Sequence, residues 1–409
     1  MKTKRLAILG ATGSIGVQTL DVVRDAPERF QVVGLSTHSR WPLLFEQARE
    51  FNPKRLVVTD ESLRGEVLES TDPLATRVAW GDSGVEALVS DPDVDVVVAA
   101  MVGAAGLFGA VKALEAGKDL ALANKETLVV GGPLVTALAK KNNVSLLPID
   151  SEHSAVFQCL QAGRRHEVAK VVLTASGGPF RTRPLEDFDD ITVEDALNHP
   201  TWKMGPKITI DSATMMNKAL EIIEARWLFD LSADEIGVMI HPQSMIHSMV
   251  EFNDGSIVAQ ASPPDMRLPI QYALTHPERT TGPAKKLDWA KIHSWELFPP
   301  DFERFPALEL GFEAARLGGT AGAALNAANE AAVAAFLAGD LSFPNIVRLC
   351  RDVLDHHPYD ARPTLDRLIE VDAWARQEAR SWISQQCRPS FSGAPSSFSS
   401  SAPSSSSTS

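Results

Sequence analysis

Two carboxylates one residue apart, Asp150 and Glu152 in the segment PIDSEHSA, are the residues most able to do chemistry. The apolar run at 144–149 precedes them and predicts an extended strand, along which side chains alternate, so both carboxylates are expected to point the same way. Two like charges this close need a cation, a shared proton or a basic partner. A hard divalent metal is the natural occupant. Taken alone, such a pair more often marks two solvated acids in a strand-to-helix turn.

A second set of polar residues lies in DSATMMNKALEIIEA. If the chain is helical from Met215, Asn217 lies four residues before Glu221 and Lys218 lies three before it, so the three side chains share one face. An isolated pair of this kind is usually a surface ion pair of little energetic value. Beside the two acids above, however, Glu221 would complete a three-carboxylate metal site, with Lys218 and Asn217 binding a phosphate or a sugar hydroxyl. Glu224, one turn further on, has no role in this scheme.

The glycines of GATGSIG, at positions 10, 13 and 16, lie between a predicted strand and a predicted helix. This context favours a dinucleotide-binding turn, in which glycines allow close approach of the backbone to a pyrophosphate, over a simple tight turn. After the second predicted strand the chain reads STHSR, without the acid that would bind a ribose 2′-hydroxyl. Ser39 and Arg40 suit a 2′-phosphate and therefore NADPH; the alternative is that Arg40 is a solvated loop residue.

The elements that must position these residues follow from the alternation of short apolar runs with amphipathic segments. Runs of this kind predict buried strands at 5–9, 32–35, 56–58, 94–99, 120–123 and 144–149. Strands that alternate with helices predict an α/β fold, here an N-terminal Rossmann-like, doubly wound parallel sheet.

Later segments predict two further units. A strand from 171, a helix at about 214–227 and strands near 237–240, 245–252 and 256–261 indicate a central α+β catalytic domain, and helical periodicity over 307–383 indicates a C-terminal α-helical bundle. The proline-rich stretch 262–306 resembles a traversing linker. We therefore expect a cofactor domain at 1–150, a catalytic domain at 151–275, a linker at 276–306, a helical domain at 307–385 and a disordered Ser/Pro-rich tail at 386–409.

Composition narrows the class of partner. The 409 residues carry a net charge of −13 and no run of Lys and Arg along one helix, so we expect neither a nucleic acid nor a membrane as partner. Three widely separated cysteines argue against a disulfide scaffold or a zinc site. The absence of an N-terminal targeting pattern and of a membrane-length apolar run favours a cytoplasmic protein.

Together the motifs closely resemble one family. In chain order they are GATGSIG, VGAAGL, LANKETLV, PIDSEHSA, TASGGPF, NHPTWKMGPKITIDSATMMNKALEIIEA, HPQSMIHSMVEF and LNAANE, spanning about residues 5–385. The chain is similar in all of them to the 1-deoxy-D-xylulose 5-phosphate reductoisomerase family. The resemblance implies an NADPH-dependent oxidoreductase and isomerase of the non-mevalonate isoprenoid pathway, which is a homodimer.

The resemblance also assigns residues. It implies metal ligands at Asp150, Glu152 and Glu221 for Mg2+, Mn2+ or Co2+. It implies catalytic roles for Lys125, Glu152 and His199. It implies contacts to a small phosphorylated ketose at Lys125, Ser151, Glu152, Ser176, His199, Ser212, Asn217, Lys218 and Glu221. It implies cofactor contacts at Thr12, Gly13, Ser14, Ile15, Asn124, Glu126 and Gly205, to which the turn adds Ser39 and Arg40.

The implied reaction rearranges 1-deoxy-D-xylulose 5-phosphate to a branched aldehyde, which NADPH reduces to 2-C-methyl-D-erythritol 4-phosphate. Residues 199–206, with Trp202, resemble a flexible lid that excludes water. One departure is that His38, Ser39 and Arg40 replace the family's usual small, basic and Asn residues, which displaces the basic residue by one position. Two alternatives stay open: another Rossmann dehydrogenase that needs no clustered carboxylates, and a non-catalytic NADP-binding sensor.

Overall fold

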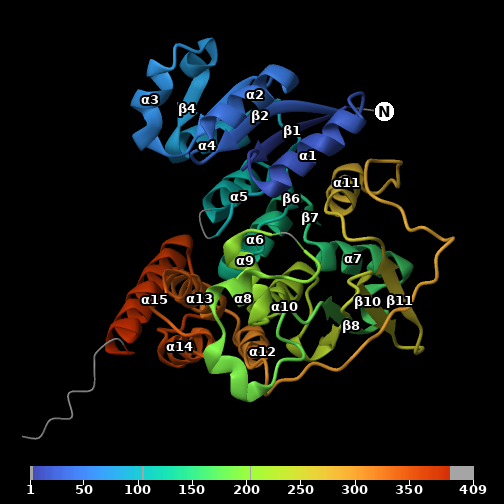
Figure 1. Ribbon diagram of the computed structural model, residues 1–409. Helices are drawn as coiled ribbons and strands as arrows, with labels where there is room; N and C mark the ends of the chain where they lie inside the picture. The colour runs from blue at the N-terminus through green and yellow to red at the C-terminus, as the bar shows by residue number, and fades with distance from the viewer. Residues whose placement is uncertain (1–2, 104–105, 203, 387–409) are drawn as a thin grey trace, which may run out of the picture.

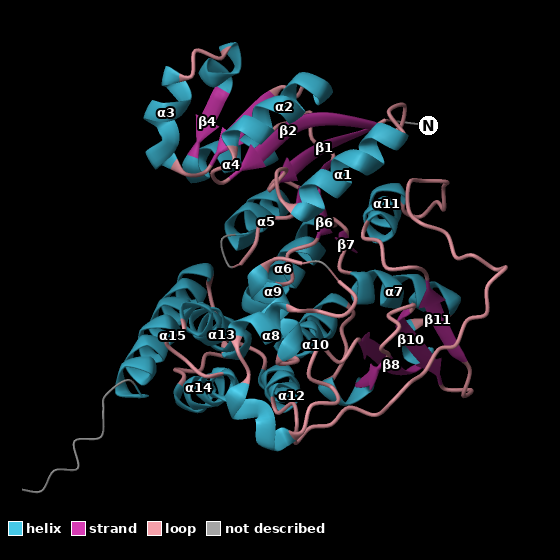
Figure 2. Ribbon diagram, viewed as in Figure 1, coloured by secondary structure: helices cyan, strands magenta, loops and turns pink. Residues whose placement is uncertain are grey.

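The first part of the chain is a parallel sheet with helices on both faces (Figures 1 and 2). The computed structural model describes residues 3–103, 106–202 and 204–386. The sheet has seven strands in the order β4-β3-β2-β1-β5-β6-β7. Their bounds are β1 (Lys4–Leu9), β2 (Phe30–Thr37), β3 (Arg55–Val58), β4 (Val78–Trp80), β5 (Val96–Ala99), β6 (Asp119–Leu122) and β7 (Leu146–Pro148). The expected doubly wound α/β fold is confirmed; only β4, three residues long, was not predicted.

Both faces of this sheet are buried, which explains why its strands are continuous apolar runs. In β1, Leu6 and Ile8 belong to one hydrophobic cluster, whereas Ala7 and Leu9 belong to the other. The alternation follows from the two-residue period of a strand. The covering helices are α1 (Ser14–Asp25), α2 (Trp41–Phe51), α3 (Arg64–Glu69), α4 (Gly81–Val89), α5 (Gly106–Glu115) and α6 (Glu126–Asn142).

The strand order reverses direction between β1 and β5, so the loops after these strands diverge at the carboxyl edge of the sheet. Ligands of doubly wound folds bind at such a switch point. The GATGSIG turn follows β1, Lys125 follows β6, and Asp150 follows β7. The topology therefore gathers the predicted cofactor turn and part of the predicted metal site along one edge.

The middle of the chain forms a smaller mixed sheet covered by helices, as the α+β prediction required. Its strands are β8 (Val168–Ala175), β9 (Ile236–Ile240), β10 (Ile246–Phe252) and β11 (Ile257–Ala261), in the order β11-β10-β8-β9. Strand β8 pairs parallel with β9 and antiparallel with β10. The accompanying helices are α7 (Ser151–Cys159), α8 (Val193–Leu197), α9 (Pro206–Ala213) and α10 (Met216–Leu228).

The proline-rich stretch 262–306 is only partly a linker, contrary to the sequence-based expectation. Helix α11 (Arg267–Thr275) buries Ile270 and Leu274 in the same cluster as Leu6 of β1. Figure 1 shows α11 beside α1. From 276 to 306 the chain then runs past β11 toward α12, with one isolated bridge between Phe298 and Ile240. Apolar burial on one helix face outweighed the Pro signal that suggested a loop.

Four helices close the described chain, α12 (Ala307–Leu317), α13 (Ala321–Ala338), α14 (Phe343–His356) and α15 (Leu365–Gln386). Helix α13 is long and apolar enough to cross a membrane, but 72% of it is buried inside the protein, as in the core helix of a helical layer. The predicted helical bundle is confirmed as part of the fold class. The tail prediction falls almost entirely on 387–409, outside the described residues.

Candidate active site

Three carboxylates converge where the first sheet meets helix α10. One oxygen each of Asp150, Glu152 and Glu221 lies within 4.8 Å of the others. The reason given from sequence was wrong, because the strand ends at Pro148 and Asp150 caps helix α7. Its Oδ1 accepts a hydrogen bond from the Ser151 backbone N–H at 3.0 Å. The first turn of a helix, and not an extended strand, brings the two acids together.

Two buried lysines lie among these acids. The Lys125 ammonium is 2.6 Å from Asp150 Oδ2 and 3.2 Å from Glu221 Oε1, and it donates to Asn217 Oδ1 at 2.9 Å. The Lys218 ammonium is 2.7 Å from Glu152 Oε1 and also contacts Glu221 Oε2. Each lysine therefore bridges two acids, as like charges at this separation require. Helix α10 places Asn217, Lys218 and Glu221 on one face, as predicted.

The acids differ in how readily they ionise. Burial and the Glu152 charge raise the pKa of Glu221 to about 7. Burial also acts to raise the pKa of Glu152, but the Lys218 ammonium outweighs it and lowers that pKa to about 2. Three oxygen donors around a common centre, with ammonium groups already in place of a cation, fit a hard divalent metal. These are the residues that would hold one.

The predicted substrate residues at Ser176 and His199 lie together. The Ser176 hydroxyl is 3.1 Å from His199 Nε2, and His199 Nδ1 accepts a hydrogen bond from the Trp202 backbone N–H at 2.9 Å. The start of the predicted lid is therefore fixed to the loop after β8. Lys203 of that segment lies outside the described residues.

The loop after β8 also approaches the end of helix α9, which carries Ser212. Gly178 has φ +64°, and a Cβ there would lie 2.7 Å from the Ser212 carbonyl oxygen. Only glycine combines this left-handed backbone with so close an approach. The Ser151 hydroxyl, by contrast, is used locally as a donor to Glu152. The predicted substrate residues thus come from several elements, and Ser151, Asn217 and Lys218 contact the carboxylates directly.

The turn after β1 is built for close backbone packing. Gly10 has φ +83°, and a Cβ at Gly16 would lie 2.3 Å from the Gly10 carbonyl oxygen. Gly13 caps helix α1 without a side-chain hydrogen bond, so Ser14 and Ile15 present backbone N–H groups at a helix N-terminus. The Thr12 hydroxyl is 2.6 Å from that of Thr37. A helix start of this form suits the pyrophosphate of a dinucleotide.

The end of strand β2 is buried, and the turn that follows it is exposed. Ser36 is buried and its hydroxyl accepts a hydrogen bond from the Gly10 backbone N–H at 3.1 Å. Ser39 and Arg40 are exposed at the same edge of the sheet. Their position is compatible with the predicted contact to a 2′-phosphate.

Asn124 and Glu126 lie at the start of helix α6. The Asn124 amide nitrogen donates to the Gly103 carbonyl at 3.1 Å and to Glu126 Oε2 at 2.9 Å, while its oxygen accepts from Thr127. The Asn124 side chain is thus occupied inside the protein, and its backbone N–H and carbonyl also make hydrogen bonds within the protein. Gly205 is exposed just before helix α9.

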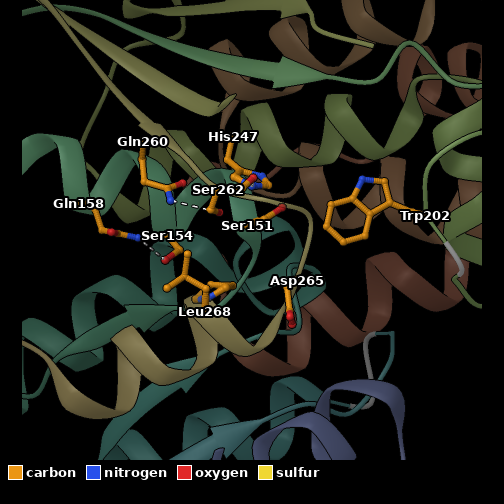
Figure 3. A pocket seen from close by; sticks show the side chains of 10 residues that line it. Ser151, Ser154, Gln158, Trp202, His247, Gln260, Ser262, Asp265 and Leu268 are labelled. Atoms are coloured by element: carbon orange, nitrogen blue, oxygen red, sulfur yellow. Dashed lines mark hydrogen bonds between the residues drawn. The ribbon is translucent and has the colours of Figure 1, made fainter. Parts of the chain in front are cut away.

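A small pocket opens beside the carboxylates, with the Trp202 indole on one side and Gln158 and Ser154 on the other (Figure 3). Ser151 and His247 lie between them. Trp202 was expected to act as an apolar cover. His247 was not singled out, although the motif HPQSMIHSMVEF contains it.

Sequence reasoning also missed His153, which is buried behind the carboxylates. Its Nε2 is 3.0 Å from the Glu221 carbonyl oxygen, and its Nδ1 is 3.4 Å from Glu224 Oε2. A His donating to a backbone carbonyl has a fixed tautomer, and it holds α10 against α7. The position directly after Glu152 was the signal that could have identified it.

Comparison with known proteins gives one family throughout. Family models match at three stretches: 1-deoxy-D-xylulose 5-phosphate reductoisomerase at 6–132, its C-terminal domain at 146–229, and the DXP reductoisomerase C-terminal domain at 261–378. The 1-deoxy-D-xylulose 5-phosphate reductoisomerase of Chloroherpeton thalassium is 51% identical over 91% of this chain and 97% of its own. That of Chlorobium phaeobacteroides is 52% identical over 92% and 99%.

Crystal structures agree with the sequences. A reductoisomerase in complex with NADPH, fosmidomycin and magnesium matches with a TM-score of 0.88 at 42% identity, covering 94% of this chain and 99% of that one. The Zymomonas mobilis enzyme in complex with NADPH matches with a TM-score of 0.87 at 42% identity, over 93% and 99%. The chain therefore belongs to the 1-deoxy-D-xylulose 5-phosphate reductoisomerase family.

Proposed function

We propose that this protein converts 1-deoxy-D-xylulose 5-phosphate to 2-C-methyl-D-erythritol 4-phosphate, with NADPH as reductant and a divalent metal as cofactor. Family membership over nearly the whole chain supports the reaction. The single observation that carries it is the cluster of three carboxylates and two lysines at the same edge of the sheet as a dinucleotide-binding turn. Another Rossmann dehydrogenase would not need this cluster, and a sensor would have no reason to keep it.

Asp150, Glu152 and Glu221 would hold the metal, which acts as a Lewis acid toward the carbonyl and hydroxyl oxygens of the substrate. Lys218 and Lys125 bridge the same carboxylates, so they offset the repulsion between the acids and orient them. Lys125 lies at the carboxyl edge of the sheet and reaches the acids from the cofactor side. Burial disfavours the Lys125 ammonium, but the charges of Asp150 and Glu221 outweigh burial and hold the pKa of Lys125 above its usual range, so it is suited to keep a positive charge near the reacting carbons.

The substrate phosphate would be bound by the hydroxyl, amide and ammonium donors of Ser176, Ser212, Asn217 and Lys218. His199 contacts Ser176 and the Trp202 backbone, so it links this phosphate site to the lid. Binding energy from the phosphate, which does not react, would then position the reacting carbons and help to exclude water.

NADPH would bind along the turn after β1. Backbone groups of Thr12, Gly13, Ser14 and Ile15 would meet the pyrophosphate at the start of α1. Ser39 and Arg40 would bind the 2′-phosphate. Asn124, Glu126 and Gly205 would contact the nicotinamide end. Fosmidomycin, present in a related complex, is expected to bind at the substrate site.

The proposal divides the chain into a cofactor unit at 1–150, a catalytic unit at 151–275, a linker at 276–306 and a helical unit at 307–385. We also propose that the protein is a cytoplasmic homodimer. Exposed apolar side chains support an interface along the linker and the edge strand β11: Ile292 is fully exposed, Trp289 is 82% exposed and Ile257 is 61% exposed. Such a surface beside a free strand edge favours pairing with a second copy.

The test is NADPH oxidation, followed at its near-UV absorbance with 1-deoxy-D-xylulose 5-phosphate, with and without Mg2+ or Mn2+. The unmodified protein should oxidise NADPH only with metal, and Glu152→Gln should abolish this while still binding NADPH. The proposal would be contradicted if the folded protein bound NADPH but did not oxidise it.

A further inference from the structure

A second buried ion-pair network lies beside the cofactor site, and among its charged members only Glu126 has been assigned a role so far. Its centre is Lys207, in the first turn of helix α9. The Lys207 ammonium is 3.1 Å from Glu126 Oε1 and 2.8 Å from Asp211 Oδ2. Only 24% of the Lys207 side chain is exposed, with 9% for Glu126 and 1% for Asp211. One ammonium group therefore joins an acid of the first sheet's edge to an acid of α9.

Asp211 is fixed from a third element. Its Oδ1 accepts a hydrogen bond from the Asn329 amide at 2.8 Å, and Asn329 is fully buried on α13. Asn329 belongs to the LNAANE motif, to which the proposed reaction gives no role. Asp211 directly precedes Ser212, a proposed phosphate contact. Helix α9 is therefore held at this point by the C-terminal helical unit.

Glu126 continues the network toward the cofactor. Its second oxygen accepts from Asn124, whose amide also donates to the Gly103 carbonyl in the loop after β5. Burial disfavours the Lys207 ammonium, but the charges of Asp211 and Glu126 outweigh burial and hold the pKa of Lys207 above its usual range. A charged link thus runs from the cofactor edge to the helix that carries Ser212.

We propose that Lys207 is a positioning residue that couples cofactor binding to substrate binding, by tying Glu126 to Asp211 and so fixing helix α9. This inference rests on the proposed function, in which Glu126 meets NADPH and Ser212 meets the substrate phosphate. A ligand that orders Glu126 also orders Lys207 and α9, so the second ligand finds its site already arranged. Without the ammonium, the two buried carboxylates have no common partner and the two sites become independent.

The experiment measures the Kd of fosmidomycin, with Mg2+ present, in the absence and in the presence of saturating NADPH by isothermal titration calorimetry. The ratio of the two values is the coupling factor. For the unmodified protein we expect at least about fivefold tighter binding with NADPH. For Lys207→Met the ratio should fall to within about twofold of one. General destabilisation would weaken fosmidomycin binding with and without NADPH alike and would leave this ratio unchanged.

Lys112→Met is the matched control. Lys112 is 28% exposed and, like Lys207, bridges two carboxylates, Glu86 at 3.1 Å and Glu115 at 3.3 Å, but none of these three residues is a proposed contact to either ligand. It should keep the coupling factor of the unmodified protein. If Lys207→Met does not fold, Asp211→Asn tests the same link, because it removes the charge that Lys207 meets while preserving the shape of the side chain.

A folded Lys207→Met or Asp211→Asn protein with the coupling factor of the unmodified protein would overturn the proposal. So would an unmodified protein in which NADPH leaves the Kd of fosmidomycin unchanged. Failure of the proposed function gives a different result: the ligands and their coupling would be measured, but 1-deoxy-D-xylulose 5-phosphate would not be converted.

Discussion

Replacing Lys218 by Met should destabilise the metal-free protein strongly, and a divalent metal should restore much of the loss. The Lys218 side chain is 3% exposed and its ammonium contacts Glu152 at 2.7 Å as well as Glu221. Met preserves most of the buried volume, so the change removes charge with little effect on packing. Removing one partner of a buried ion pair costs about 3–5 kcal/mol because the remaining charge stays buried.

The pH and the metal should modify this loss in predictable directions. The pKa of Glu221 is already about 7, so below pH 7 Glu221 takes up a proton, one of the two repelling charges disappears, and the loss is smaller than at pH 8. A metal at 100 times its Kd stabilises the folded state by about 2.7 kcal/mol. The variant keeps all three carboxylates, so Mn2+ should raise its free energy of unfolding by about this amount over its value in EDTA.

The assay is urea-induced unfolding followed by circular dichroism, with EDTA or with Mn2+, at pH 6 and pH 8. Lys112→Met is the control, and because that pair is partly exposed its loss should stay below about 1 kcal/mol. The assignment of this cluster as a cation site held by lysines would be refuted by equal losses for the two variants in EDTA, or by a Lys218→Met protein whose free energy of unfolding does not rise from EDTA to Mn2+.

Three further predictions concern the metal and the cofactor. Glu221, whose pKa is about 7, must lose its proton before it binds a cation. The metal affinity measured by calorimetry should therefore rise about tenfold per pH unit up to pH 7 and level off above it. A metal affinity that does not depend on pH below 7 would contradict this. Gly16→Ala should weaken NADPH binding in a fluorescence titration at least about tenfold, because its Cβ would lie 2.3 Å from a backbone oxygen. Gly65→Ala, with open space around it, should not weaken it. Equal NADPH affinities for the two variants would refute the role of the turn after β1 in binding the cofactor. Arg40→Ala should lower the ratio of kcat/KM for NADPH to that for NADH by about tenfold or more, since a charge-assisted hydrogen bond contributes about 1.5–3 kcal/mol. An unchanged ratio would show that the 2′-phosphate is bound elsewhere.

Much of the fold could be predicted because its strands are buried on both faces and therefore appear as uninterrupted apolar runs. Strand β4 escaped detection because three half-buried residues, Val78–Trp80, carry no such signal. Helix α11 escaped because the prolines around it suggested a loop, while its stability comes from Ile270 and Leu274 packing on the distant β1 side. Contacts of that separation are not encoded in any local pattern.

The candidate site was predicted in its residue types and only partly in its geometry. The spacing of Asn217, Lys218 and Glu221 is a local property of a helix, so their shared face was predicted correctly. The DxE pair was placed on a strand because the apolar run before it conceals the helix start at Asp150. The contact of Asp211 with Asn329 joins residues 118 positions apart and depends on how the helical unit packs, which one sequence does not reveal.

The measurement that tests the account most directly is product analysis. The unmodified protein reacts with 1-deoxy-D-xylulose 5-phosphate and NADPH in the presence of Mg2+ or Mn2+. Mass spectrometry then measures the amount of product, and absorbance measures the amount of NADPH oxidised. We predict one 2-C-methyl-D-erythritol 4-phosphate for each NADPH oxidised, and neither in EDTA. NADPH oxidation that yields another product, or that continues unchanged in EDTA, would contradict the account.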